Sequence, residues 1–438
     1  MTNGRSWIVA LFVAMTWLVP SAVGAQRVAV SYGNFFGFST EVINLGTGVV
    51  ESRDPRIAGG RPVFTSDGRF LLLRFRDAGG LPRLLEIRDL VTGSRTPLDL
   101  QFVPHHAHPR RLAVYGLASG VVARLDLTGL RPYASCNGAA WDVELTVDGS
   151  RLLVLCQSGD IESIDEATGV RLGVVAAGTT AEPRGFAINA DGSQALVARG
   201  VAGAGTELVL VDVATGTQIL STPMPGPPPP APFSGPGLGY IVSVTPSRDA
   251  VVITNRWFYD EVGRPGPARL HYRTQILGFA TLAPRLELAV PYDPHFMEIS
   301  PDGGHAFVAS NDLLRPFGQL QDLDLRTGQQ TVGVSTLTSA LGAAFAPLAP
   351  TLQPAEVIGQ QVTIAWSLAA HSPAAQRFVL HVGSRSGATD LGTRDVGDAT
   401  SLTVPGVPPG RYFVRMTAVN FTGTSSPSTE LIVDVPGQ

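Results

Sequence analysis

The sequence predicts an all-β protein with two domains, and three observations lead to that prediction. Its 438 residues include 49 glycines and 34 prolines but only 16% charged residues, a composition that suits short strands joined by tight turns. One strand–turn–strand pattern recurs along about the first 350 residues. After Pro350 the spacing of the apolar residues changes, which indicates a second module with its own core.

The recurring pattern is a strand, an Asp-Gly turn and a second strand. It is found around Asp67, Asp148, Asp191 and Asp302, each of which is followed by Gly. Hairpin turns place central residues at positive φ, which Gly adopts freely and Asp better than most residues. A second turn, in which Thr-Gly follows an Asp, joins a third strand to a fourth. Four strands over about 40 residues, repeated, predict a β-propeller, in which each small sheet buries its faces only against its neighbours.

Counting the repeats predicts a seven-bladed β-propeller over residues 26–349. Six units are complete, at 62–98, 103–131, 139–173, 184–220, 239–290 and 295–333. Two incomplete pieces remain, an inner-strand pattern that contains Phe345 and outer strands over residues 27–50 that contain Ile43. Because the two pieces complement each other, we expect these N- and C-terminal strands to pair in one blade and close the ring.

These Asp-Gly and Asp-x-x-Thr-Gly turns resemble those of the YVTN family of bacterial propellers and, more loosely, WD40-like and lactonase-like propellers. The resemblance covers residues 27 to 348. It implies the fold, since the residues shared with that family are turn and core residues.

The first 25 residues are predicted to be a signal peptide. Arg5 provides a positive start, an apolar core of about 13 residues follows, and Val23-Gly24-Ala25 is a small-residue cleavage site. The core is too short to cross a bilayer, which takes about 20 residues. We therefore expect a secreted or periplasmic protein that keeps no membrane span after cleavage.

The cysteine content, the net charge and the motifs of the sequence limit the compartment, the partners and the cofactors that we expect. Export places Cys136 and Cys156 in an oxidising compartment, where an even count favours a disulfide; the alternative is two unpaired core residues. The formal net charge is −4, and no stretch clusters Arg with aromatic residues, so nucleic acid is not an expected partner. Neither a haem motif nor a vicinal cysteine pair is present, so no cofactor is expected.

Residues 350–354 are predicted to be a linker and residues 355–438 a β-sandwich of about seven strands. This segment resembles a fibronectin type III domain. Trp366 and Leu402 stand where that family has core residues, and Pro409-Gly410-x-Tyr412 resembles its tyrosine corner. Ala418-x-Asn420-x-x-Gly423-x-Ser425 is similar to its late-strand motif. The resemblance implies an immunoglobulin-like module that acts as a spacer or an adhesive unit.

Candidate ligand-binding residues come from aligning the blades. The residues just before the innermost strands should face the mouth of the central channel; they are Arg61, His105, Trp141, Arg184, Tyr240 and His295. Guanidinium groups and aromatic faces suit an anionic or sugar-like ligand. The alternative is a channel that holds only water.

The run Pro104-His105-His106-Ala107-His108 is the strongest metal candidate. If it forms a strand, His106 and His108 lie on one face and His105 on the other, which prevents all three from binding one ion. We therefore expect no metal site, with His106 and His108 as the weak candidates.

The sequence favours a non-catalytic binding protein over an enzyme. No Gly-x-Ser-x-Gly nucleophile elbow occurs, and the Asp-Gly carboxylates belong to turns. We expect a monomer whose propeller binds a protein or polysaccharide partner of the cell envelope or the extracellular space. The alternative is a lactonase-like hydrolase at the channel mouth, which requires acidic or His side chains close together there.

Overall fold

The computed structural model describes residues 26–34, 37–44, 49–54, 61–76, 82–98, 100–133, 135–176, 183–201, 205–224, 238–259, 269–290, 293–311 and 318–437. Within these ranges every regular element is a strand, so the chain is all-β. The predicted signal peptide lies outside the described residues. No helix in the described ranges is long and apolar enough to cross a membrane.

Five four-stranded antiparallel sheets are each built from consecutive strands. The first contains β4 (Val63–Phe64), β5 (Phe70–Arg76), β6 (Pro82–Asp89) and β7 (Arg95–Leu98). The second contains β8 (Phe102–Ala107), β9 (Ala113–Ala118), β10 (Val121–Asp126) and β11 (Gly129–Pro132). The third contains β12 (Ala140–Leu145), β13 (Arg151–Cys156), β14 (Asp160–Asp165) and β15 (Arg171–Ala176). The fourth contains β16 (Pro183–Ile188), β17 (Gln194–Val201), β18 (Gly205–Asp212) and β19 (Gln218–Pro223). The fifth contains β20 (Leu238–Val244), β21 (Ala250–Tyr259), β22 (Arg269–Gly278) and β23 (Pro284–Leu288).

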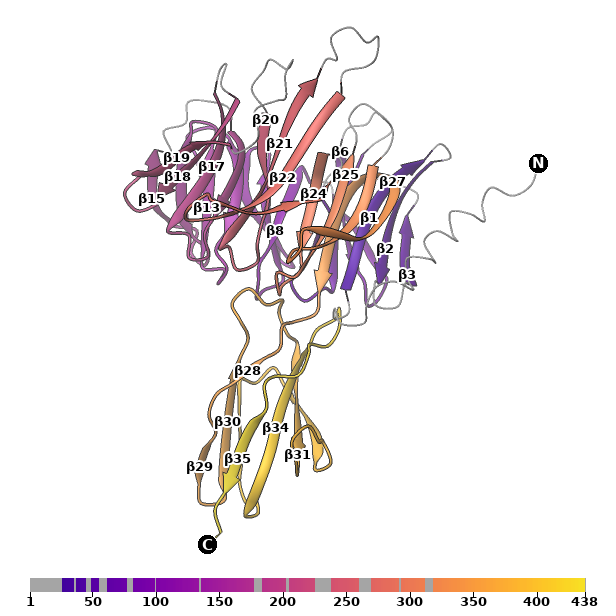
Figure 1. Ribbon diagram of the computed structural model, residues 1–438, viewed down its shortest axis with the longest axis vertical. Coiled ribbons are helices and arrows are strands. Elements are labelled where there is room, and N and C mark those ends of the chain that lie inside the picture. The colour runs from indigo at the N-terminus through magenta and orange to yellow at the C-terminus, as the bar shows by residue number, and fades with distance from the viewer. Residues whose placement is uncertain are drawn as a thin grey trace, which may run out of the picture.

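A larger sheet joins the two ends of this region. Its order is β24 (Asp293–Ile299), β25 (His305–Asn311), β26 (Gly318–Asp324), β27 (Gln329–Phe345), β1 (Gln26–Asn34), β2 (Gly37–Asn44) and β3 (Val49–Asp54). The first half of β27 pairs with β26, and the second half pairs with β1, from Gln26 opposite Phe345 to Gly33 opposite Leu337. Figure 1 shows β1 beside β27, although they are far apart in sequence. Ile43 and Phe345 therefore lie in one sheet, as the sequence predicted.

The Asp-Gly turns are held by their own carboxylates. Asp148 Oδ1 accepts hydrogen bonds from Thr146 Oγ1 at 2.7 Å and from the Ser150 amide at 3.0 Å, and Gly149 has a φ of 75°. A residue with a Cβ is strained at that φ, which explains why Gly recurs in these turns.

Apolar side chains of neighbouring sheets form the core. One cluster combines Val63 and Leu85 of the first sheet with Phe102 and Val114 of the second, and all four are buried. The sheets thus pack face to face around the molecule, in a propeller-like arrangement.

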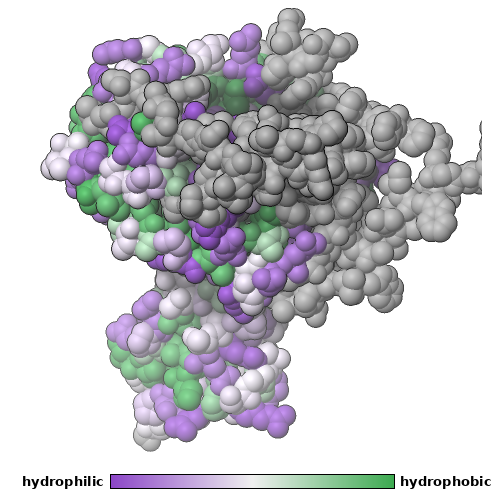
Figure 2. Space-filling view, turned by 45° about the horizontal axis from the view of Figure 1, so that its top comes forward, coloured by the Kyte–Doolittle hydropathy of each residue, from purple (hydrophilic) through white to green (hydrophobic). Residues whose placement is uncertain are grey.

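The C-terminal module is a separate two-sheet sandwich. One sheet contains β28 (Thr351–Leu352), β29 (Glu356–Ile358), β30 (Gln361–Ser367) and β33 (Ser401–Val404). The other contains β31 (Arg377–Gly383), β32 (Gly392–Gly397), β34 (Gly410–Val419) and β35 (Leu431–Val435). In Figure 2 this module forms a smaller lobe, and hydrophilic and hydrophobic residues are interspersed on its visible face.

Trp366 and Tyr412 both contribute to the structure of the module. Trp366 is 3% exposed and meets the Phe378 ring edge-on at 5.9 Å, and the Tyr412 hydroxyl donates to the Pro408 carbonyl at 2.8 Å. The predicted linker differs, because Thr351 and Leu352 already pair with β30. The module's hydrogen bonding therefore begins inside the segment that was expected to connect the domains.

A disulfide joins Cys136 to Cys156, with the two Cα atoms 5.6 Å apart. The disulfide covalently links the segment before β12 to Cys156, the last residue of β13 in the third sheet. The Cys136 amide also donates to Glu162 Oε2 at 2.9 Å.

Candidate functional site

The candidate site lies where the first strands of the sheets, such as β8, β12 and β24, meet at the centre of the propeller-like region. The turns that follow these strands begin at His108, Thr146, Thr245 and Ser300. Two residues before these turns stand His106, Glu144, Ser243 and Glu298. Four residues before a turn of this kind stand Arg61, Asp142, Gly185 and Ile241. All eight residues line one cavity, although a bulge interrupts the alternation of β20 between Ile241 and Ser243.

This cavity, the channel pocket, has a volume of about 370 Å³. Its lining comes from strands or turns of five different sheets and from Arg61, which precedes β4 of the first sheet. The lining residues are Arg61, Val103, Pro104, His105, His106, Asp142, Glu144, Gly185, Phe186, Ile241, Val242, Ser243, Val244, Arg248, Glu298 and Ile299. Among these described residues are three carboxylates, two guanidinium groups and two imidazoles. The size suits a small ligand or the end group of a larger one.

Arg61 and Glu298 form the first ion pair of the pocket. Arg61 Nε and Nη2 both approach Glu298 Oε1, at 2.8 and 2.7 Å. Burial alone would lower the pKa of Arg61, but attraction by Glu298 raises it. Burial raises the pKa of Glu298, and Arg61 opposes that rise.

Glu144 is shared between two partners. Its Oε2 lies 2.8 Å from Arg248 Nη2, and its Oε1 lies 3.5 Å from His106 Nε2. The pKa of His106 is lowered to about 4, chiefly by burial and also by Arg61 and Arg248, although Glu144 opposes the change. His106 is therefore neutral at pH 7.

Arg248 reaches the pocket from an unusual turn. It occupies the place that Gly68 holds in the first sheet, with a φ of 56°, a region that is strained for residues with a side chain. Its guanidinium also donates to the Ile188 carbonyl at 3.3 Å. Backbone strain retained at a pocket-lining residue is typical of functional sites.

His105 and Asp142 form the third polar pair, with His105 Nδ1 2.9 Å from Asp142 Oδ1. The Val143 amide donates to the same oxygen at 2.8 Å. His105 is the extra residue of a β-bulge, because Pro104 pairs with Gly116 and His106 with Tyr115.

That bulge corrects one prediction. Strict alternation placed His105 on the face opposite His106, but both side chains line the pocket, with ring centroids 6.4 Å apart. A bulge interrupts the alternation of a strand, and the sequence carries no signal for it here.

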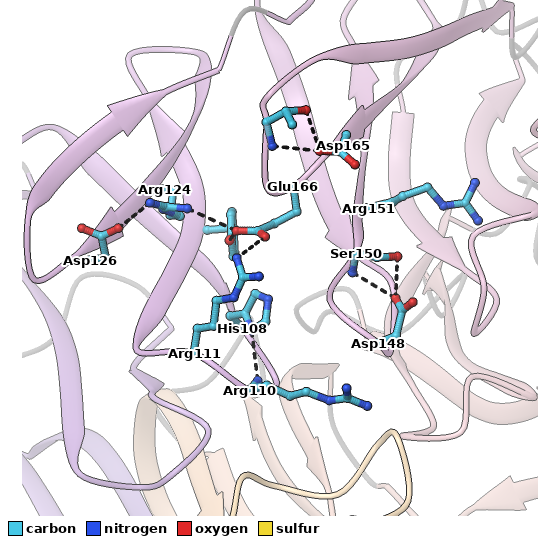
Figure 3. A network of polar contacts seen from close by, with 12 residues as sticks. His108, Arg110, Arg111, Arg124, Asp126, Asp148, Ser150, Arg151, Asp165 and Glu166 are labelled. Atoms are coloured by element: carbon cyan, nitrogen blue, oxygen red, sulfur yellow. Dashed lines mark hydrogen bonds and ion pairs between the residues drawn. The ribbon is translucent and has the colours of Figure 1, made fainter.

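His108 lies elsewhere, beside a buried polar network. Its Nδ1 accepts a hydrogen bond from the Arg110 amide at 3.0 Å (Figure 3), and its ring is 6.2 Å from that of Tyr115. Burial lowers its pKa. His106 and His108 therefore do not meet at one ion site.

Three of the other predicted residues are not among the described residues that line the pocket. Trp141 is 38% exposed, the guanidinium of Arg184 lies over Gly200, and the ring of Tyr240 faces Arg256 at 5.8 Å. Trp141 and Arg184 are the extra residues of bulges in β12 and β16, where the alternation of side chains is interrupted. The side chain of His295 lies outside the described residues.

The described residues offer one group of three metal-ligand types, Cys136, Cys156 and Glu162. Both sulfurs of that group are in the disulfide, so neither is a thiolate ligand. Within the described residues, nothing else places three ligand atoms together.

Comparisons with known proteins find similar solved structures but no matching family. No family model matches the chain, and no curated protein matches it. Among solved structures, hydrazine synthase of Kuenenia stuttgartiensis is 14% identical, with 61% of this chain and 76% of that chain covered and a TM-score of 0.45.

The dihydro-heme d1 dehydrogenase NirN is 16% identical, with 73% and 75% covered and a TM-score of 0.45. The Cps50 (Swd1) β-propeller domain of Myceliophteria thermophila is 12% identical, with 66% and 93% covered and a TM-score of 0.44. At this level of similarity the matches carry no statement about activity or partner.

Proposed function

We propose that this is an exported, non-catalytic binding protein whose seven-bladed propeller holds a neutral polyhydroxyl group, such as the end of a saccharide, in the channel pocket. Five blades are the four-stranded sheets. The sixth is β24 to β26 with the first half of β27, and the seventh is the second half of β27 with β1 to β3. A fibronectin type III domain follows as a spacer or an adhesive module.

The charge balance of the pocket carries the proposal. Each guanidinium that lines it is already paired with a carboxylate, Arg61 with Glu298 and Arg248 with Glu144. An anion would also be repelled by the three carboxylates in the same pocket, so the expectation of an anionic ligand loses support. Hydroxyl groups both donate and accept, so they can bind carboxylates and imidazoles without a net charge.

The export signal predicted from the sequence and the disulfide are the support for a proposed periplasmic or extracellular place of action. A cell-envelope or extracellular polysaccharide is the partner that fits both the location and the pocket. No described feature requires a second copy of the chain, and the proposed state is a monomer.

The test is binding of glycans to the mature protein, first on an array and then by calorimetry with the glycans that bind. Asp142→Asn removes the charge that orients His105 and should weaken binding about tenfold, the effect of losing one hydrogen bond to a charged group. Asp434→Asn, in an exposed pair of the C-terminal module, is the matched control and should leave affinity unchanged. No binding to any saccharide, or equal loss in both variants, contradicts the proposal.

A second candidate function is hydrolysis, and the 2.9 Å contact between His105 and Asp142 favours it. A carboxylate that fixes an imidazole is the arrangement found at general bases that activate water. The test is turnover of a panel of lactones and esters. Activity that disappears in His105→Gln would establish hydrolysis, and no turnover by the wild-type protein would exclude it for that panel.

A further inference from the structure

A second cavity of about 220 Å³ lies where the propeller-like sheets meet the C-terminal module. The sheets contribute Phe64, Thr65, Ser66, Pro109, Pro246, Ile299, Pro301, Ala343, Ala344 and Phe345, and the module contributes His371, Ser372 and Pro373. We call residues 371–373 the floor segment. The cavity wall is largely apolar, with the rings of Phe64 and of three turn prolines among its groups.

The two cavities lie one after the other along the channel. Ile299 lines both of them, and it is the last residue of the inner strand β24. The lining of the second cavity comes from the first, second and fifth four-stranded sheets and from the seven-stranded sheet. Because residues from sheets around the ring converge there, the floor segment lies under the channel and not at its rim.

Three hydrogen bonds fix the module to the sheets. Asn420 Nδ2 donates to the Phe345 carbonyl at 3.0 Å, and the Phe421 amide donates to the Asp67 carbonyl at 3.1 Å. Arg27 Nη1 donates to the Phe421 carbonyl at 2.6 Å. Asn420 is 6% exposed, so its side chain is buried in this contact. Figure 1 shows the module held at this side of the sheets.

Side-chain packing supports the same contact. The Arg69 guanidinium lies 4.8 Å from the Phe70 ring and 5.6 Å from the Phe421 ring, within the range of cation–π attraction. At Gly68, a Cβ would come 1.9 Å from Thr422 Oγ1, so the turn and the module are in close contact there. The Leu348 amide donates to Ser372 Oγ at 2.9 Å, which positions the floor segment itself.

We infer that the C-terminal module closes the turn-side mouth of the channel, so that ligands reach the channel pocket only from the opposite face. The apolar second cavity adds to this closure, because a polar ligand would lose its water contacts there without gaining partners. The inference goes beyond the proposed binding function, since access can be measured without any ligand. It gives the module a role in the site, in addition to that of a spacer.

The test introduces one thiol into the second cavity. Ala343→Cys provides it, and the native cysteines do not compete because they form the disulfide. The probe is a methanethiosulfonate reagent with a trimethylammonium group, used on the full-length mature protein. Labelling should be about tenfold or more slower than in the same variant unfolded in urea, because reaction requires local opening.

A second substitution, which we call the wedge, should push the module away from the turn and open the turn-side mouth of the channel. Gly68→Ala places a methyl group against Thr422 and should raise the labelling rate about tenfold. Gly303→Ala is the matched control: it occupies the same turn position, has a φ of 69° against 74° for Gly68, and its Cβ would meet nothing within 4 Å. Its labelling rate should stay at that of the parent variant.

Three results would overturn the inference: rapid labelling of Ala343→Cys alone, no change on adding Gly68→Ala, or an equal increase with Gly303→Ala. Phe421→Ala replaces the wedge if Gly68→Ala does not fold. Its control is Ile432→Ala, at an exposed position of β35. Failure to bind saccharide would leave these labelling rates unaffected, so the two proposals fail separately.

Discussion

At the scale of single residues, His106 shows how burial and charge set the state of the pocket. Its imidazole is neutral because water is excluded and because cations lie nearby. The groups that face it are Glu144, Arg61, Arg248 and His105. A neutral imidazole hydrogen-bonds without adding a third positive group to a pocket that already holds two guanidinium groups.

This state predicts a pH dependence of stability. The folded pKa of His106, about 4, is lower than the ordinary 6.5, so the unfolded chain binds the proton more tightly. The contribution of neutral His106 to the free energy of unfolding is therefore fully present above pH 6.5 and is lost as the pH falls toward 4. Between pH 7 and 4, wild type should lose about 1–3 kcal/mol more unfolding free energy than His106→Gln. Urea denaturation at several pH values measures this, and parallel pH profiles would contradict it.

The sequence identified part of this pocket. It nominated Arg61 and His105, and it named His106 as a weak metal candidate. Asp142, Glu144 and Glu298 were missed because residues were aligned by nearness to the strand start, whereas counting in twos back from the turn selects all three. Arg248 could have been noticed as the residue that replaces the usual turn Gly, but its reach to Glu144 depends on how the sheets pack.

At the scale of elements, buried ion clusters join neighbouring sheets. Glu166, 1% exposed, follows β14 and accepts from Arg111 Nη1 at 2.6 Å and from Arg124 Nη1 at 3.3 Å. Its other contact is with the Tyr115 hydroxyl, and these partners come from the preceding sheet (Figure 3). Burial and Glu166 raise the pKa of Tyr115. Short-range sequence patterns cannot reveal such contacts between sheets.

Removing the charge of Glu166 should therefore weaken the contact between the second and third sheets. Glu166→Gln removes the buried carboxylate that Arg111 and Arg124 share. Arg124 keeps its ion pair with Asp126 at 2.7 Å, so the expected cost is that of weakened hydrogen bonds to a charged group, about 1.5–3 kcal/mol of unfolding free energy. Asp434→Asn is the control, because Asp434 and Arg411 are 61% and 63% exposed, and it should cost less than about 1 kcal/mol. Chemical denaturation measures both, and equal costs would show that burial does not strengthen the Glu166 cluster.

At the scale of the whole molecule, the two ends of the propeller-like region meet in one sheet. The sequence predicted this pairing because each end carried only part of a repeat, and a partial sheet leaves apolar faces and strand edges unpaired. The pairing of Val28 with Ala343 and of Ala29 with Gly342 follows that expectation. The docking of the module could not be predicted, since Asn420 Nδ2 and the Phe421 amide donate to the backbone carbonyls of Phe345 and Asp67, acceptors that any sequence would supply.

Closure of the molecule should therefore depend on the buried face of β1. Val30 is 1% exposed and packs with Phe307 and Leu341, so Val30→Ala removes buried methyl groups and leaves a cavity between the two ends of the chain. We expect a loss of about 1–3 kcal/mol of unfolding free energy. Val49→Ala in β3 makes the same chemical change in the same sheet at a side chain that is 55% exposed, and it should stay within about 0.5 kcal/mol of wild type. Thermal and urea denaturation of both variants measure the difference. If β1 were an accessory strand, the two substitutions would cost the same, and the closed arrangement of the sheets would not depend on the buried face of β1.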